Sequence, residues 1–281
     1  AVVMSNEMSF LEIVQAQMAS NDTCLPPFDT TAQQIRQEIM KEDPDVQLIE
    51  KLIVRDQAIT SQVLRVANSS FYKGLVKAST VRNAILRLGI NEVSNMVTMV
   101  TMEKSFRSKD PFVNGVLHEL WRHSVGCGFG GHWLAKKGGF QSLAHEAFFA
   151  GLLHDVGKLF ILAVVEKIRR SGNMAQQPSN ALLDEVMRNM HSDYGYTLMN
   201  NWNLPSRYCA VARDHHTEEI DSKDSLSVLV RMANHACHKV GVGSNADPAV
   251  ILAALPEAKA LGLSDMDLAQ LEIQLEDLPL C

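Results

Sequence analysis

The spacing of apolar residues constrains this chain more than any other feature of its sequence. Apolar positions recur every three or four residues almost throughout, as at Ile35 and Ile39 or at Val46, Ile49 and Ile53. This 3.6-residue period is typical of helices that bury one face, whereas the period-two alternation of half-buried strands is almost absent. The sequence therefore predicts an all-α fold, built as a bundle of many helices.

The length of the chain leaves room for one large helical unit with distinct parts. Hydrophobic residues make up 46% of the 281 residues and charged residues 21%, which is enough for a sizeable core. We expect residues 1–281 to form a single unit. Within it we distinguish an N-terminal helical half at residues 10–110, a helical core at residues 111–240 and a C-terminal helical extension at residues 241–281.

Turn and capping residues predict where several helices begin and end. Gly89 is expected to end a helix over residues 79–88, and Asn91 to cap the next helix, which runs through Met102. A later apolar stretch over residues 143–164 is expected to be interrupted near Gly157. The last two helices are expected around residues 249–255 and 265–275.

The charge balance argues against nucleic acid as a partner. The formal net charge is −6, and only short clusters of basic residues occur. Phosphate backbones are held by clustered Lys and Arg. We therefore expect no nucleic-acid partner.

The cysteines and the apolar runs bear on the cellular compartment. The five cysteines are widely spaced, odd in number and never arranged as CxxC, which argues against a disulfide framework and a thiolate zinc site. The N-terminal residues lack the pattern of a signal peptide, and no apolar run approaches the roughly 20 residues that span a bilayer. We expect a cytoplasmic protein with no membrane association.

The chemistry-bearing residues are concentrated in the second half of the chain. All ten histidines follow Asp110. The segment from Ala150 to Leu159 places the His154-Asp155 dyad and Lys158 within an apolar stretch. Burying such groups is costly unless each finds a partner, and a metal ion would supply one.

Other donors could join the dyad. Glu119 and His123 are four residues apart and share a helix face, and His191 follows on a later helix. His215 and His216 are neighbours, so both reach one site only if it lies between them or the helix is ending. A helix end is plausible there because polar residues follow.

Two interpretations of these donor residues remain open. Nitrogen and oxygen ligands suit iron or manganese first, with zinc, nickel or magnesium as alternatives, and one or two ions could activate water against a phosphoester. Alternatively, the histidines are incidental to a metal-free helical scaffold. His118, His132, His145, His235 and His238 are expected to have ordinary structural roles, and no serine-nucleophile elbow or P-loop occurs.

Several stretches resemble the HDOD family, the HD-related output domains of the HD superfamily of metal-dependent phosphohydrolases. These stretches are Leu25-Pro26-Pro27, the run from Leu64 to Tyr72 that contains Asn68-Ser69-Ser70-Phe71-Tyr72, the run from Val81 to Gly89, and the His154-Asp155 segment. Together they extend from near Phe10 to Val211. The resemblance implies an N-terminal helical half packed on an HD-type helical core that carries the metal site.

Comparison with the related HD-GYP phosphodiesterases implies a set of site residues. The metal ligands would be Glu119, His123, His154, Asp155, His191, His215, His216 and Asn234, and the catalytic residues Asp155 and Lys158. Asn234 stands where the superfamily has an aspartate, which weakens the hold on a cation. The GYP segment is absent after His216, so specificity for cyclic di-GMP is not carried over.

The resemblance implies a regulatory role in bacterial signal transduction. HDOD proteins are generally considered signalling modules, and many have lost the metal ligands of the superfamily. We expect a signalling protein partner or a small phosphorylated ligand, because no receiver, kinase or DNA-binding domain occurs in the sequence. An active phosphohydrolase acting on a nucleotide or another phosphoester is the alternative.

Overall fold

The computed structural model describes residues 10–19, 27–72, 76–171 and 178–278. Within these ranges the chain is helical with turns and contains no strand, which confirms the predicted all-α class. Cys24, Leu25, Pro26 and Cys281 lie outside the described residues, so part of the Leu25-Pro26-Pro27 stretch is among them.

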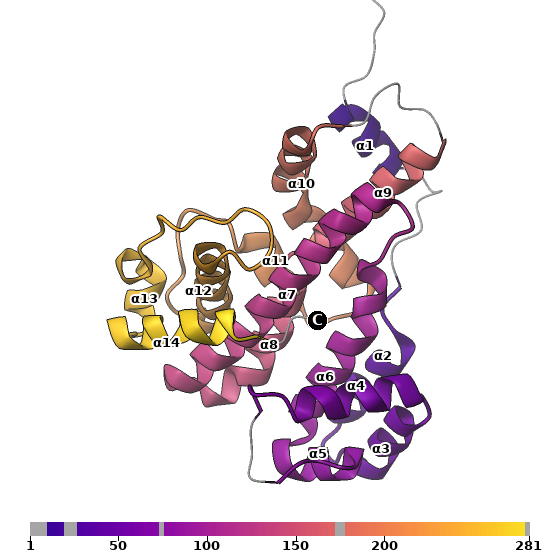
Figure 1. Ribbon diagram of the computed structural model, residues 1–281, viewed down its shortest axis with the longest axis vertical. Helices are drawn as coiled ribbons and strands as arrows, with labels where there is room; N and C mark the ends of the chain where they lie inside the picture. The colour runs from indigo at the N-terminus through magenta and orange to yellow at the C-terminus, as the bar shows by residue number, and fades with distance from the viewer. Residues whose placement is uncertain (1–9, 20–26, 73–75, 172–177, 279–281) are drawn as a thin grey trace, which may run out of the picture.

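The helices follow one another in three groups along the chain (Figure 1). The first group is α1 (Phe10–Ala19), α2 (Thr30–Ile39), α3 (Val46–Val54), α4 (Gln57–Ala67), α5 (Val81–Leu88) and α6 (Ile90–Met102). The second is α7 (Pro111–Lys137), α8 (Ala144–Leu153), α9 (Val156–Ser171), α10 (Asn180–Asn201), α11 (Ser206–Asp214) and α12 (Ser225–Val240). The last is α13 (Pro256–Ala260) and α14 (Asp265–Glu276), and short 3-10 turns cover Glu103–Phe106, Gln141–Leu143 and Leu252–Ala254.

Aspartates begin many of these helices. The carboxylate of an aspartate accepts backbone N–H groups at the start of α2, α3, α4, α7 and α12, and these aspartates are Asp29, Asp45, Asp56, Asp110 and Asp224. Such caps satisfy N–H groups that have no partner within the helix, and the negative charge suits the positive end of the helix dipole. The start of each of these helices is therefore determined by a residue next to it in the sequence.

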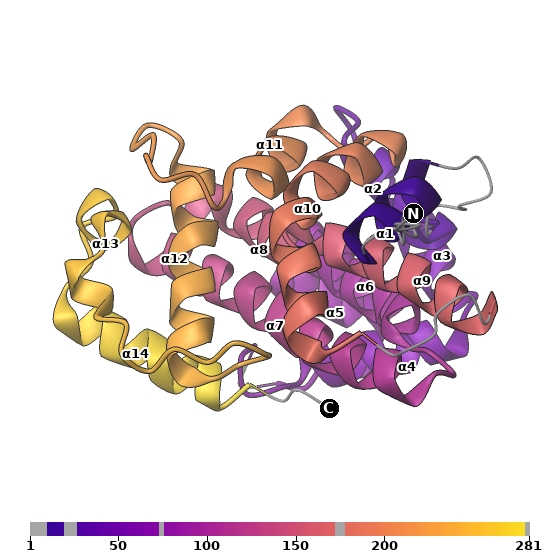
Figure 2. The ribbon, with the colours of Figure 1, turned by 90° about the horizontal axis from the view of Figure 1, so that it is seen from above.

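The long helix α7 forms the centre of the molecule. It packs against α8 along one side and α12 along another, while α14 contacts both α7 and α12, and α13 contacts α12 (Figures 1 and 2). The approach of α8 depends on Gly151, since a Cβ there would lie 2.5 Å from the carbonyl oxygen of Cys127 on α7. This close contact holds the end of α8 against the middle of α7.

The region around the dyad is more apolar than the sequence prediction allowed. The stretch Gln141–Ser171 is long enough to cross a membrane and contains an 18-residue window of mean hydropathy 1.8, so the prediction that no run approaches that length was wrong. However, 89% of this window is buried inside the protein. The apolar character is accounted for by its place in the core.

The Asn68–Tyr72 signature joins the N-terminal half to the core. The Asn68 side chain donates to the carbonyls of Leu64 and Ala78 and accepts from the Ala78 N–H, which ties α4 to the segment before α5. Phe71 packs on Phe129 of α7, with ring centroids 4.5 Å apart. The signature thus has an architectural role, and helices α2 to α6 lie together as one group in Figure 1.

Three predicted boundaries differ from the structure. Gly89, with a φ of 90°, ends α5 as expected, but α6 starts at Ile90 with no side-chain cap, and Asn91 is already inside it. The break between α8 and α9 falls at His154 and Asp155 rather than at Gly157. The helix expected at residues 249–255 is only a 3-10 turn, because the helix begins where Pro256 can occupy its first position.

Candidate metal centre

The dyad occupies the break between α8 and α9. His154 caps the end of α8, and Asp155 is followed directly by Val156, the first residue of α9. Both side chains are buried, with only 1% of each residue exposed. A helix interruption inside the core therefore presents an imidazole and a carboxylate to the surrounding helices.

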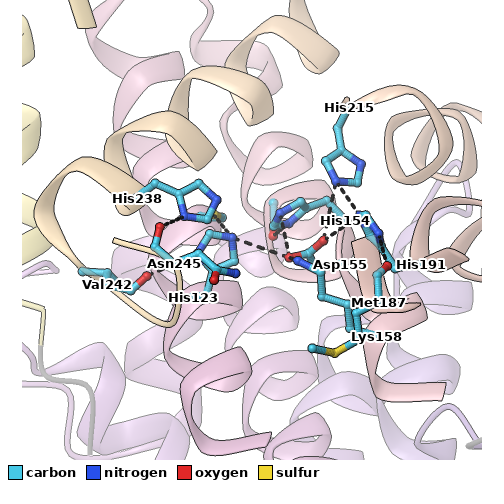
Figure 3. Close-up of polar contacts among 12 residues, drawn as sticks. His123, His154, Asp155, Lys158, Met187, His191, His215, His238, Val242 and Asn245 are labelled. Atoms are coloured by element: carbon cyan, nitrogen blue, oxygen red, sulfur yellow. Dashed lines mark hydrogen bonds and ion pairs between the residues drawn. The ribbon is translucent and has the colours of Figure 1, made fainter. Parts of the chain in front are cut away.

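Four imidazoles surround the Asp155 carboxylate (Figure 3). The Nε2 atoms of His123 and His154 lie 3.6 and 3.5 Å from Oδ2 of Asp155. The Nε2 atoms of His191 and His215 lie 3.3 and 3.5 Å from Oδ1. The residues come from α7, the α8–α9 break, α10 and the end of α11, so the fold gathers positions that are far apart in the sequence.

A backbone carbonyl orients each of these four rings. Nδ1 of His154 lies 2.7 Å from the Gly151 oxygen, and Nδ1 of His191 lies 2.7 Å from the Met187 oxygen. Nδ1 of His215 lies 2.9 Å from the Ala212 oxygen, and Nδ1 of His123 lies 3.2 Å from the Val242 oxygen. A carbonyl only accepts, so in each neutral ring the proton sits on Nδ1 and Nε2 carries a bare lone pair.

Burial keeps the rings neutral. It lowers the pKa of His154 to about 3 and the pKa of His215 to about 4, and it also lowers the pKa values of His123 and His191. Burial alone would raise the pKa of Asp155, but the Lys158 ammonium, 2.6 Å from Oδ2, holds it well below its ordinary value. The centre is thus one carboxylate facing four imidazole lone pairs.

The arrangement leaves polar atoms without partners. Nε2 of His154 and Oδ1 of Asp155 are buried and have no hydrogen-bond partner, a state that is normally avoided. His216 lies just past the end of α11, with its ring 4.0 Å from that of His215. Asp155, His191, His215 and His216 offer donors within 4.8 Å of one another, as do His123, His154 and Asp155. Both sets fit a divalent cation, and Asp155 belongs to each.

An open cavity of about 380 Å³ gives access to the centre. Its lining includes Lys158, Arg188, His191, His216, His235 and His238. Cationic side chains next to a metal-ligand set suit an anionic ligand such as a phosphoester.

The sequence matches the HDOD domain over residues 25–218. The chain belongs to the HDOD family. An uncharacterized protein of Treponema pallidum (strain Nichols) is 28% identical over 181 residues, which are 62% of this chain and 34% of that protein. The match to this HDOD chain therefore spans about a third of the length of that relative.

Solved structures share the HDOD fold. An HDOD domain protein from Geobacter sulfurreducens is 22% identical with a TM-score of 0.70, covering 95% of this chain and 93% of that one. A Shewanella amazonensis SB2B protein named "putative metal-dependent phosphohydrolase" is 19% identical with a TM-score of 0.70, covering 94% and 97%. A Marinobacter aquaeolei VT8 protein named "putative signal transduction protein" is 21% identical with a TM-score of 0.63, covering 90% and 56%. At these identities the likeness establishes the fold.

The structure does not bring the Glu119 carboxylate into the cluster of donors. Glu119 is one turn before His123 on α7, as predicted, but its side chain is 36% exposed and bonds to Arg122 at 3.0 Å. His118 lies 3.3 Å from its other oxygen. The Glu119 side chain instead reaches solvent, where the neighbouring Arg122 holds its carboxylate.

Asn234 is a residue of α12, the helix that also carries Arg231 and His238. It is buried on α12, and its Oδ1 has no hydrogen-bond partner. It shares a helix face with Arg231, which donates to the His215 carbonyl at 3.2 Å, and with His238, whose ring stacks on His123 at 4.8 Å. Its role as a ligand stays a prediction.

Three neighbours of the centre were not predicted from the sequence. His238 was expected to have an ordinary structural role, yet it stacks on His123 and lines the cavity. Cys127 and Cys237 lie against His123, although the wide spacing of the cysteines argued against thiolate ligands. The four-residue spacing of His123 and Cys127 was the one signal available, since Cys237 comes from another helix.

Proposed function

We propose that this HDOD protein is a signalling module that binds a divalent metal at Asp155 and a phosphorylated ligand in the adjoining cavity. The observation that carries the proposal is the convergence of four Nε2 lone pairs on one buried carboxylate, with every Nδ1 bonded to a carbonyl. Such carbonyls typically orient metal-binding histidines.

The donor set indicates which residues would hold the cation. Asp155, His191, His215 and His216 form one group, and His154 lies against Asp155 on the other side. Mixed nitrogen and oxygen ligands suit iron or manganese, with zinc, nickel and magnesium as alternatives. A bound cation would act there as a Lewis acid toward a phosphoryl oxygen or a water molecule.

Lys158 supports the choice of a phosphorylated ligand. Its ammonium donates to Asp155 and also lines the cavity, where its remaining N–H groups can donate to phosphate oxygens. Arg188 lines the same cavity and adds a second positive charge. The cavity also contains Asp184 and Asp247, so the cation placed at the metal donors is Lys158, which is bonded to Asp155.

Hydrolysis of a phosphoester is a second candidate function. Asp155 and Lys158, the expected catalytic residues, are in contact with each other, and the cavity gives a substrate access to Lys158. Asp155 would hold the cation, and Lys158 would stabilise charge on the phosphoryl group.

The cellular setting follows from the same family. We infer a bacterial cytoplasmic signalling protein that receives its input from a separate protein or a small ligand. The HDOD match and the relative named as a signal transduction protein support this role.

Metal analysis of tag-free protein, purified anaerobically without chelator, tests the proposal. We expect about one equivalent or more of a transition metal, retained by His118→Gln and lost in His191→Gln. His118 is an exposed histidine outside the donor set. Less than about a tenth of an equivalent of transition metal in the parent protein would contradict the metal site and favour a metal-free helical scaffold. With metal present, hydrolysis of a generic phosphodiester by parent and Asp155→Asn then separates turnover from binding.

A further inference from the structure

Two buried thiols lie against the centre on the side of His123. His123 and Cys127 are one turn apart on α7, and Cys237 comes from α12, which packs along α7. One donor atom from each of the three lies within 4.8 Å of the others. Cys127 and Cys237 are fully buried, and His123 is 3% exposed.

The donors point toward a common position. The Cys127 sulfur lies 3.5 Å from Nε2 of His123, whose Nδ1 is bonded to the Val242 carbonyl. The same Nε2 is 3.6 Å from Oδ2 of Asp155. The Cys237 sulfur sits close to the α7 backbone, because a Cβ built at Gly126 would be 3.0 Å from it. Two sulfurs and one imidazole nitrogen are thus adjacent.

We propose that Cys127, Cys237 and His123 form a second, thiolate-containing cation site suited to zinc. Two thiolates and an imidazole are ligands of the kind that zinc takes in tetrahedral sites, with the fourth position left to a water molecule. The site goes beyond the proposed function, whose cation is held by Asp155, His191, His215 and His216, and the two donor sets have no residue in common.

The charges of the buried groups balance. Binding breaks the S–H bonds of Cys127 and Cys237, both protons pass to solvent, and two thiolates neutralise one divalent cation. His123 contributes a neutral ring, and the Asp155 carboxylate keeps its ion pair with Lys158. A site buried this deeply needs such neutrality, because an uncompensated charge in the core is costly.

On α7, Cys127 rather than Glu119 is the neighbour of the His123 ring. Residues 119, 123 and 127 follow one face of α7 at four-residue intervals. Glu119, at the outer position, bonds to Arg122, and Cys127, at the inner position, faces His123. The α7 ligand pair would accordingly be His123 with Cys127 rather than with Glu119.

Cobalt substitution of the intact, reduced protein tests the site. A thiolate bound to Co²⁺ gives an intense charge-transfer band in the near ultraviolet, which imidazole and carboxylate ligands do not give. We expect the band in the parent and its loss in Cys127→Ser and Cys237→Ser, with one cobalt ion fewer per chain. Cys209→Ser is the matched control, since Cys209 is buried on α11 near the carbonyls of Leu204 and Pro205.

The outcomes separate this site from the proposed function. His191→Gln should lose the cation held by imidazoles and keep the charge-transfer band. Bound cobalt without the band, or a band that survives both serine substitutions, would overturn the thiolate site and leave the proposed function standing. Absence of any bound cobalt would overturn both. Zinc X-ray absorption of the parent needs no variant, and we expect sulfur neighbours at about 2.3 Å; their absence in zinc-loaded protein would contradict the site.

Discussion

The Nε2 atoms of His191 and His215 lie 3.2 Å apart, although the Nδ1 proton of each ring is held by a backbone carbonyl. Two neutral rings oriented in this way present lone pairs to each other with no proton between them. Burial lowers the pKa of both rings, so protonating one of them to place a proton between the two nitrogens is unfavourable. A cation between or beside the two nitrogens removes the conflict, and for this reason metal binding should stabilise the fold.

Divalent metal should raise the melting temperature of chelator-treated protein. At a free metal concentration of a hundred times the Kd, we expect a rise of roughly 5–10 °C in differential scanning calorimetry. His215→Gln should lose most of this rise. The metal-free variant should nevertheless keep the stability of the metal-free parent, because the amide can donate to His191. A large loss of stability in that variant would mean that the two rings attract each other without metal.

Gly157 should tolerate no side chain. A Cβ at this position would collide with the carbonyl oxygen of His191, on the helix that carries one of the metal donors. Gly157→Ala should destabilise the protein by about 3 kcal/mol and reduce metal content, since α9 and α10 must move apart. Urea unfolding and metal analysis measure the two effects.

Gly115 provides the matched control for that substitution. It lies within α7, and a Cβ there meets nothing within 4 Å. Gly115→Ala should stabilise the protein by about 0.5–1 kcal/mol and leave the metal content unchanged. Equal destabilisation by both substitutions would contradict the role given to the α9–α10 contact.

The sequence predicted the parts of this fold that depend on local patterns. The helical class follows from apolar spacing, and Gly89 ends α5 because its φ of 90° suits glycine. The dyad and the paired histidines were visible as polar groups in apolar surroundings. The expectation that a helix ends near His215 is confirmed, since α11 stops at Asp214.

Features that arise from contacts between helices were not predictable from local patterns. Gly157 was read as a helix breaker, whereas it is a point of close approach to α10. Glu119 shares a helix face with His123, but the neighbouring Arg122 decides where its carboxylate goes. Cys237 reaches His123 only because α12 packs along α7, and the long intervening chain gives no sign of that contact.

Lys158 should contribute to binding of phosphate without being needed for the metal. In metal-loaded protein, Lys158→Gln should weaken binding of inorganic phosphate roughly tenfold, the effect of losing one charge-assisted hydrogen bond. Metal content should stay unchanged, because the ammonium contributes no lone pair. Lys77→Gln removes the same charge from an exposed position and should have little effect. Isothermal titration calorimetry gives the comparison, and equal losses in both variants would indicate only a long-range charge effect.

A second buried group of titratable residues links the N-terminal half to the core and should make stability depend on pH. Glu92 of α6 lies 3.3 Å from Nε2 of His132 on α7 and 3.6 Å from Nδ1 of His145 on α8. Lys136 is 3.7 Å from the same carboxylate oxygen, and Tyr72 donates to the other oxygen at 3.1 Å. Although Glu92 favours the charged ring, burial outweighs it and lowers the pKa of His132 from 6.5 to about 4.

The sign of the pH dependence follows from that shift. Between pH 6.5 and about 4 the unfolded chain binds a proton at His132 that the native protein does not. The contribution of the neutral His132 to the free energy of unfolding is therefore complete above pH 6.5 and is lost as the pH falls toward about 4. We expect His132→Asn to flatten the decline in unfolding free energy by up to about 1.4 kcal/mol per pH unit. Urea unfolding of metal-free protein between these pH values measures the slope. In His118→Asn, which changes an exposed histidine, the free energy of unfolding should decline with falling pH as steeply as in the parent. Parallel slopes for parent and His132→Asn would show that His132 accepts its proton within the folded protein.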